Sequence, residues 1–154
     1  MIRHATHDDL PEVLRLLEGF HAICGANRYA AWGESRWSWE RWVLGCIDHD
    51  LAACILAATD DQRVVGVCTA AVVTAFWNKD VKALQETVLY VEPFSAGRGY
   101  GKELVNGLID FATAMDCDCL AVGSQEGMDP RTAEGLYRSM GFSREETVFS
   151  RRIK

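Results

Sequence analysis

Four stretches of the chain repeat their apolar residues with the spacing of an amphipathic helix. We expect helices from Asp8 to about residue 18, from Ser35 to His49, from the end of a turn at 95–101 to about Met115, and from Pro130 to Met140. The carboxylates of Asp8 and Asp9 suit a helix start, and Pro130 suits a first helical position. For the third helix the spacing predicts a buried face made of Leu104, Val105, Leu108, Ile109 and Ala112.

Six shorter segments have the composition of strands. They are 1–5, 51–58, 63–74, 83–91, 119–123 and 146–153. The second and third of these are hydrophobic almost throughout, which predicts cover on both faces of a sheet. We expect irregular structure at 19–33 and a loop at 75–81. The order of elements, without repeat or linker, predicts one mixed α/β domain over residues 1–154.

Composition and charge narrow the classes of function. The 154 residues are 49% hydrophobic, which suits one globular domain. The formal net charge is −6, and without a basic stripe we expect no nucleic-acid partner. The six cysteines form no Cys-x-x-Cys pair, so we expect free thiols and no metal site. With neither a signal peptide nor a membrane span, we expect a cytoplasmic protein that binds no membrane.

The most informative segment is the glycine-rich turn Gly97-Arg98-Gly99-Tyr100-Gly101-Lys102 between a strand and a helix. Glycines let a backbone approach a phosphate, and free N–H groups at a helix start bind anions. A P-loop is excluded because Ala96 and Glu103 stand where glycine and a hydroxyl are needed. The Rossmann spacing fails as well, because Lys102 or Leu104 replaces its last glycine. A plain tight turn is the alternative reading.

Two segments together resemble the GNAT N-acetyltransferase superfamily. The segment 91–105, Val-Glu-Pro-Phe-Ser-Ala-Gly-Arg-Gly-Tyr-Gly-Lys-Glu-Leu-Val, resembles its coenzyme A turn, although Ala96 replaces the usual Arg or Gln. The segment 133–142, Ala-Glu-Gly-Leu-Tyr-Arg-Ser-Met-Gly-Phe, resembles its Ala-x-x-Leu-Tyr-x-x-x-Gly-Phe helix, although Pro130 replaces a common Asn. The resemblance covers nearly the whole chain.

The resemblance implies a GNAT fold, with a single mostly antiparallel sheet flanked by helices on both faces. It implies acetyl-CoA as co-substrate and transfer of its acetyl group to a primary amine by direct attack. The strand ending at Val91 would diverge from the strand 120–123 and leave a backbone edge for the coenzyme. The coenzyme would be bound by Leu89, Tyr90, Val91, Ala96, Gly97, Arg98, Gly99, Tyr100, Gly101 and Lys102.

Tyr137 matches the family's general acid, which protonates the leaving thiolate. A place in the helix core is the alternative, because Tyr137 lies on an apolar stripe. For the base we name Glu86, yet alignment on the glycine turn puts Gln85 at the family's carboxylate position. A one-residue slip changes the face of a strand, and a bulge would restore Glu86. Otherwise Glu126 or a water relay takes the proton.

The acceptor is a small-molecule or peptide amine that the sequence does not identify. Trp32, Trp37 and Trp77, in or near loops, and Glu126 are our candidates to line its site, whereas Trp39 and Trp42 suit a helix core. A homodimer is possible for this fold. Two rivals stay open: a catalytically weak acyl-CoA-binding or sensing module, and transfer of a longer acyl chain.

Overall fold

A computed structural model describes residues 1–23, 36–59, 61–75, 78–124 and 130–145. Its strands form one sheet in the order β1-β2-β3-β4-β5. Neighbouring strands are antiparallel except for β4 and β5, which are parallel. The strands are β1 (Ile2–His4), β2 (Ala52–Ala58), β3 (Val64–Ala75), β4 (Asn78–Val91) and β5 (Cys119–Ala121).

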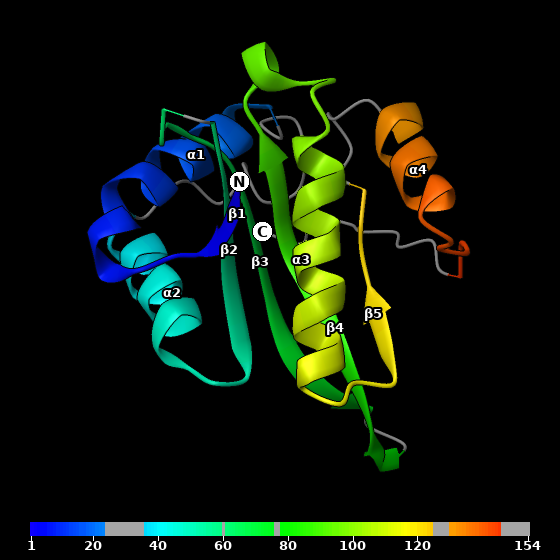
Figure 1. Ribbon diagram of the computed structural model, residues 1–154. Coiled ribbons are helices and arrows are strands. Elements are labelled where there is room, and N and C mark those ends of the chain that lie inside the picture. The colour runs from blue at the N-terminus through cyan, green and yellow to red at the C-terminus, as the bar shows by residue number, and fades with distance from the viewer. Residues whose placement is uncertain (24–35, 60, 76–77, 125–129, 146–154) are drawn as a thin grey trace, which may run out of the picture.

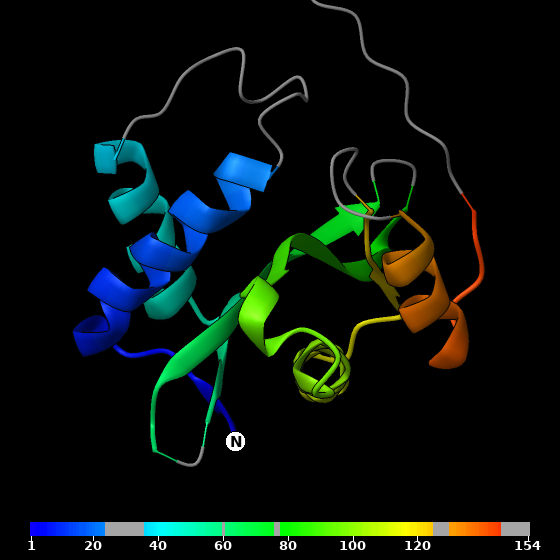
Figure 2. The same ribbon diagram turned by 90° about the horizontal axis from the view of Figure 1, so that it is seen from above.

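Helices cover both faces of this sheet, as expected (Figures 1 and 2). They are α1 (Leu10–Ile23), α2 (Arg36–Asp48), α3 (Tyr100–Ala114) and α4 (Pro130–Ser139). Figure 2 shows α1 and α2 on one face and α3 on the other, with α4 beside β5. We call these the α1 face and the α3 face. None of the helices described is long and apolar enough to cross a bilayer.

Two groups of buried side chains fill the spaces between the layers. The first joins α1 and α2 to the sheet and includes Val13, Leu17, Val43, Leu56, Val88 and Tyr90, with Trp39 and Trp42 partly buried against it. The second joins α3 to the sheet and includes Ile55, Cys68, Ala70, Leu84, Leu104 and Leu108. Both faces of β2 and β3 are therefore apolar, which explains their nearly continuous hydrophobic sequence.

The five cysteines that the structure describes are free thiols, and Cys24 lies outside the described residues. Among the described residues no group of three or more His, Cys, Asp or Glu side chains is placed to hold a metal ion.

Four sequence-based expectations about the elements and their buried faces differ from the structure. α1 continues to Ile23, because Gly19 does not end it. A Cβ atom at Gly19 would lie 2.6 Å from Oη of Tyr90, so glycine is there to let Tyr90 pack against the helix. The expected loop 75–81 is largely strand, because Ala75 pairs with Asn78 and β4 begins there.

The other two differences concern the α3 side of the molecule. β5 ends at Ala121, two residues early, where β4 and β5 stop pairing. Ile109 is 36% exposed, so the buried face of α3 is narrower than its spacing predicts. The expected strand 146–153 lies outside the described residues.

Candidate functional site

The first part of the site is the divergence of β4 and β5. Their backbones pair over three positions, which end at Gln85 opposite Ala121. From Glu86 to Val91 the β5 side of β4 has no strand neighbour in the part of the chain described, while its other side pairs with β3. An open strand edge is a template for an extended ligand that carries amide groups. The expected divergence is therefore present.

A β-bulge lies in β4 at the same level. Thr69 of β3 is opposite Val88, and the next residue, Ala70, is opposite Glu86. Thr87 is thus an extra residue on β4, and the bulge that the sequence left as one alternative exists. Leu84 belongs to the core of the α3 face, and Glu86, two residues on, points to that same side. Gln85 is exposed on the opposite face.

The side chains of Glu86 and Tyr137 meet at the backbone of Gly123, just beyond β5. The N–H of Gly123 donates a hydrogen bond to Oε2 of Glu86 at 2.9 Å. The hydroxyl of Tyr137, from α4, donates to the carbonyl oxygen of Gly123 at 3.0 Å. Tyr137 is buried, with the ring of Phe142 5.8 Å from its own. The two residues named for acid and base chemistry therefore share one point, where β4 and β5 separate.

Burial sets the proton affinities at this point. It raises the pKa of Glu86 to about 7, against the opposing effect of the Gly123 N–H, which stabilises the carboxylate. Burial and the nearby Glu86 carboxylate raise the pKa of Tyr137 above its ordinary range, so the phenol stays protonated. Near neutral pH, Glu86 is poised to accept a proton while Tyr137 keeps one.

The glycine turn follows β4 directly. Gly97 and Gly99 have φ angles of 76° and 90°, a left-handed backbone that favours glycine, and α3 starts at Tyr100. Along α3, the first backbone N–H that has a hydrogen-bond acceptor is that of Glu103, which donates to the carbonyl oxygen of Gly99, the residue before the helix, at 3.0 Å. The N–H groups of Tyr100, Gly101 and Lys102 thus have no acceptor among the described residues. Such a helix start binds phosphate.

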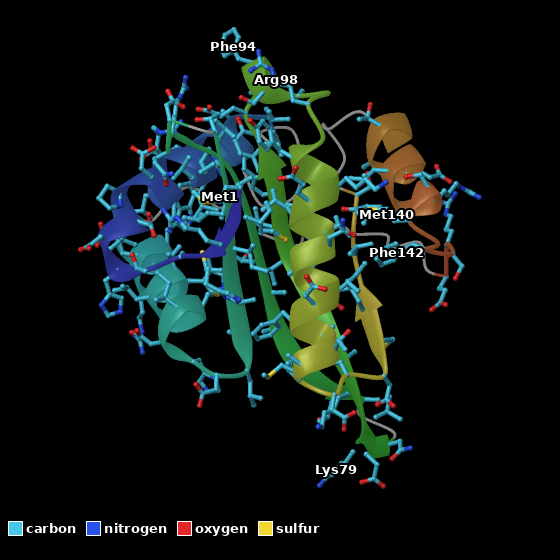
Figure 3. All side chains as sticks on the ribbon, in the orientation of Figure 1. Met1, Lys79, Phe94, Arg98, Met140 and Phe142 are labelled. Carbon is cyan, nitrogen blue, oxygen red and sulfur yellow. The ribbon has the colours of Figure 1, made fainter. Side chains whose placement is uncertain are left out.

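Charge around the turn is locally positive. Arg98 and Lys102 are exposed and form no ion pair in the part of the chain that the structure describes. Figure 3 shows Arg98 at the same end of the molecule as Phe94, which is 90% exposed. Ala96 is exposed too and offers only its backbone. Both cations therefore remain available to an anionic ligand.

A buried carboxylate anchors the start of this turn. Glu92 follows the end of β4 and is 9% exposed. It accepts hydrogen bonds from Arg15 of α1 and from Arg63 of the β2–β3 connection, the second at 3.0 Å. Its own N–H donates to the carbonyl of Val65 at 2.9 Å. The strand end that carries the turn is thus tied to two other elements.

The remaining predicted coenzyme residues divide by face. Leu89 and Val91 pack against the core of the α3 face. The side chain of Tyr90 is instead buried on the α1 face, so Tyr90 can offer a coenzyme only its backbone. The acceptor candidates Trp32, Trp77 and Glu126 lie outside the described residues, as does the side chain of Trp37, whose backbone is in α2.

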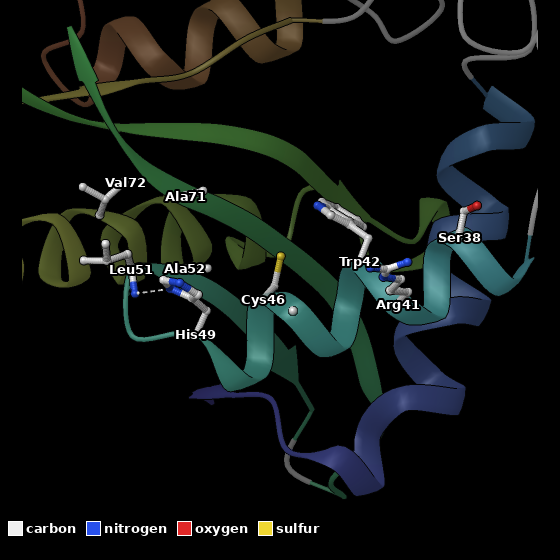
Figure 4. Close-up of a pocket in the computed structure, with 10 residues that line it drawn as sticks. Ser38, Arg41, Trp42, Cys46, His49, Leu51, Ala52, Ala71 and Val72 are labelled. Carbon is white, nitrogen blue, oxygen red and sulfur yellow. Dashed lines mark hydrogen bonds between the residues drawn. The ribbon is translucent and has the colours of Figure 1, made fainter.

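A groove of about 630 Å³ lies between α2 and the strands β2 and β3 (Figure 4). It is lined by Ser38, Arg41, Trp42, Gly45, Cys46, His49, Leu51, Ala52, Ala71 and Val72. Figure 4 shows the side chains of Trp42 and Cys46 reaching from α2 toward the sheet, on the α1 face. Glu86 points to the other face, so this groove and the Glu86–Tyr137 pair belong to different surfaces.

The sequence model of the acetyltransferase (GNAT) family matches residues 15–142, which include the bulge, the glycine turn and Tyr137. The chain belongs to the GNAT acetyltransferase family. A search of curated proteins gives no significant match. Membership accounts for the order of elements and for the separation of β4 from β5, the last strand of the described sheet.

Solved GNAT-like structures share the fold at low sequence identity. A probable acetyltransferase superposes with a TM-score of 0.78 at 16% identity, over 100% of this chain and 98% of its own. A ribosomal-protein-alanine N-acetyltransferase from Brucella melitensis biovar Abortus 2308 superposes with a TM-score of 0.72 at 17% identity, over 99% of this chain and 99% of its own. A glucosamine-6-phosphate N-acetyltransferase from Arabidopsis thaliana superposes with a TM-score of 0.76 at 15% identity, over 100% of this chain and 98% of its own. The TM-scores show that this GNAT chain shares its fold with these proteins, whereas identities this low leave its acceptor open.

Sequence reasoning missed three residues of this site. Gly123 escapes it because its two hydrogen bonds are made by its backbone. Thr69 and Thr87 support the bulge and look like ordinary strand threonines. The bulge itself carried no signal in the sequence, because a strand covered on both faces can place Leu84 and Leu89 on opposite sides.

Proposed function

We propose that this GNAT protein is an N-acetyltransferase that moves the acetyl group of acetyl-CoA to a primary amine by direct attack. The observation that carries the proposal is the meeting of Glu86 and Tyr137 on the backbone of Gly123. A group able to accept a proton and a group able to donate one lie at the place where β4 opens an edge to a ligand.

The coenzyme would follow this open edge. Its pantetheine amides would pair with the β4 backbone of Leu89, Tyr90 and Val91. Its pyrophosphate would accept hydrogen bonds from the N–H groups of residues 100–102, with Arg98 and Lys102 adding positive charge. The exposed Ala96 provides no side-chain contact, so backbone groups would carry most of this binding.

The chemistry balances with the two side chains. The neutral amine attacks the thioester carbonyl carbon, the C–N bond forms and the C–S bond breaks. The proton lost by the amine goes to Glu86, directly or through a water molecule. The hydroxyl of Tyr137 gives its proton to the thiolate that leaves. A backbone N–H near Leu89 would stabilise the negative charge on the carbonyl oxygen.

Thiol release from acetyl-CoA, measured across a panel of small amines and amine-bearing peptides, tests the proposal. We expect release that depends on an amine and exceeds the hydrolysis measured without one. Isothermal titration with acetyl-CoA runs in parallel. Tight coenzyme binding without amine-stimulated release from any member of the panel would instead favour an acyl-CoA-binding or sensing module. Longer acyl-CoA thioesters in the same assay decide the acyl-chain preference.

A further inference from the structure

The bulge in β4 lets two leucines, one fully buried and one partly buried, pack on the same face of the sheet. Leu84 is fully buried in the core of the α3 face, and Leu89 packs against the same core. Positions 84 and 89 are separated by an odd number of steps, and side chains of a regular strand alternate between faces. Both leucines can reach the α3 face only if one extra residue lies between them. In this structure the extra residue is Thr87.

The leucines do not decide where the extra residue goes. A bulge nearer the start of β4, in which Gln85 and Glu86 share a face, would satisfy Leu84 and Leu89 equally well. It would turn Glu86 to the α1 face, away from Gly123 and Tyr137. Some other contact must therefore select position 87.

A pair of hydroxyl groups makes that selection. The hydroxyl of Thr87 donates to the carbonyl oxygen of Thr69 at 3.1 Å, and the two Oγ1 atoms lie 2.8 Å apart. Because Thr87 has one hydroxyl proton, the hydroxyl of Thr69 is the donor between the two. Thr69 has no exposed surface. A buried hydroxyl that loses its partner is costly, so the bond favours a bulge that keeps the Thr87 hydroxyl beside Thr69.

We propose that Thr69 and Thr87 are positioning residues, whose hydroxyl pair holds the bulge at position 87 and so keeps the Glu86 carboxylate on Gly123 beside Tyr137. The inference deepens the proposed function, on which its kinetic part rests. Its structural part concerns only where Glu86 points in the protein without coenzyme.

The test begins with Thr87→Val, which keeps the β-branched shape and removes the hydroxyl. Thr69→Val removes the same bond from the other strand. Thr87→Ser keeps the hydroxyl and is expected to restore wild-type behaviour. Thr74→Val is the matched control, because Thr74 is exposed on β3 and lies at the other register shift of the β3–β4 pair, five residues from Thr69.

The first readout is NMR of the full chain without coenzyme, as a pH titration of the Glu86 carboxyl carbon and the Gly123 amide. In the wild type both signals should report one ionisation, with the pKa of Glu86 near 7. In Thr87→Val and Thr69→Val we expect the Glu86 pKa to fall toward its ordinary value of 4.5 and the Gly123 response to disappear. The double variant should be no worse than either single one.

The second readout is steady-state kinetics with the best amine. We expect kcat to fall roughly tenfold or more in both valine variants, with little change in KM for acetyl-CoA. Thr87→Ser and Thr74→Val should keep the wild-type rate.

Wild-type titration of Glu86 and Gly123 in both valine variants would overturn the positioning role. If one variant does not fold, the other still decides. A different outcome bears on the proposed function alone: if Glu86→Gln keeps the full rate, Glu86 is not the base, whereas the NMR result still decides whether the two threonines position it.

Discussion

At the scale of single residues, Glu86 combines two demands that oppose each other. It must ionise to accept a proton, yet it lies where burial disfavours its charge. Among the described residues, the N–H of Gly123 supplies the one compensating hydrogen bond to its carboxylate. Tyr137 has the complementary arrangement, because burial and the same carboxylate hold its proton in place.

Glu86→Gln should therefore stabilise the fold at high pH. The pKa of Glu86 is about 7 in the folded state and near 4.5 when unfolded, so the native state holds the proton more tightly. Stability from this group is present below pH 4.5 and is lost as pH rises toward 7. We expect urea unfolding at pH 8 to show the variant more stable by roughly 1–3 kcal/mol, with no such gain at pH 4.

Asp110→Asn, on the exposed side of α3, is the matched control for that experiment. It should show no gain between the two pH values. An equal gain in both variants would assign the effect to net charge and not to the burial of Glu86.

Tyr137→Phe should lower kcat about a hundredfold and leave the affinity for acetyl-CoA nearly unchanged. The ring keeps its buried contacts, and only the hydroxyl that donates to Gly123 is lost. Stopped assays with the best amine give the rate, and titration calorimetry gives the affinity. An unaltered kcat would make Tyr137 a core residue, which is the alternative that its helical stripe allows.

At the scale of elements, the start of α1 depends on one carboxylate. Asp9 accepts two hydrogen bonds from Arg3, at 2.6 and 2.7 Å. It also accepts bonds from the N–H and the hydroxyl of Thr6, at 2.8 and 3.0 Å. The guanidinium of Arg3 holds the pKa of Asp9 well below its ordinary value. One side chain thus joins β1 to the first turn before α1.

Asp9→Asn should lower the free energy of unfolding by about 1–2 kcal/mol at pH 7, because it removes the charge that Arg3 and Thr6 bind. A carboxyl with a lowered pKa contributes stability above its unfolded pKa and loses it as pH falls through its folded pKa. The difference from wild type should therefore shrink below about pH 4 in denaturant melts. Asp8→Asn is the control. If Asp8→Asn lowers the free energy of unfolding as much as Asp9→Asn does, the loss comes from a general effect of charge at the helix end and not from the contact with Arg3.

The elements themselves were largely predictable from sequence, because apolar spacing reports which side of a helix or strand is buried. The spacing failed where a tertiary contact overrules a local preference. Gly19 reads as a helix end, yet it lies inside α1 because Tyr90 needs the space of its missing side chain. The site was predictable where side chains carry a motif, as at Tyr137 and the glycine turn. It was not predictable at Gly123, where backbone groups make the contacts.

At the scale of the whole molecule, a coenzyme would join parts that the protein alone holds together weakly. β4 and β5 pair over only three positions, and the α3 start beyond them keeps free N–H groups. A ligand lying along β4 and ending on α3 adds contacts across this opening. Its binding should appear as a gain in the stability of the entire fold.

Acetyl-CoA at a hundred times its Kd should raise the unfolding free energy by about 2.7 kcal/mol and the melting temperature by roughly 5–10 °C. Differential scanning fluorimetry measures the shift. Gly99→Glu should abolish it, because the variant puts negative charge and a strained left-handed backbone at the turn. Gly45→Glu adds the same charge at an exposed position of α2, where a side chain has open space and the backbone is helical, and should keep the shift. If acetyl-CoA still raised the melting temperature of Gly99→Glu by the full amount, the coenzyme would bind at a site other than the glycine turn.

Because β4 contains an extra residue, the position of Glu86 along the chain and its position in the sheet register differ by one. Counted along the chain from the glycine turn, Glu86 stands one place away from where a regular strand would carry its carboxylate. Counted along the sheet, Thr87 occupies no rung of the ladder, because Thr69 and Ala70 are successive partners of Val88 and Glu86. A relative without this residue, counted back from the glycine turn, would align its carboxylate with Thr87 in sequence and with Glu86 in space. An alignment of this strand with the same strand of a relative should therefore follow the paired residues on β3 and not the number of residues along the chain.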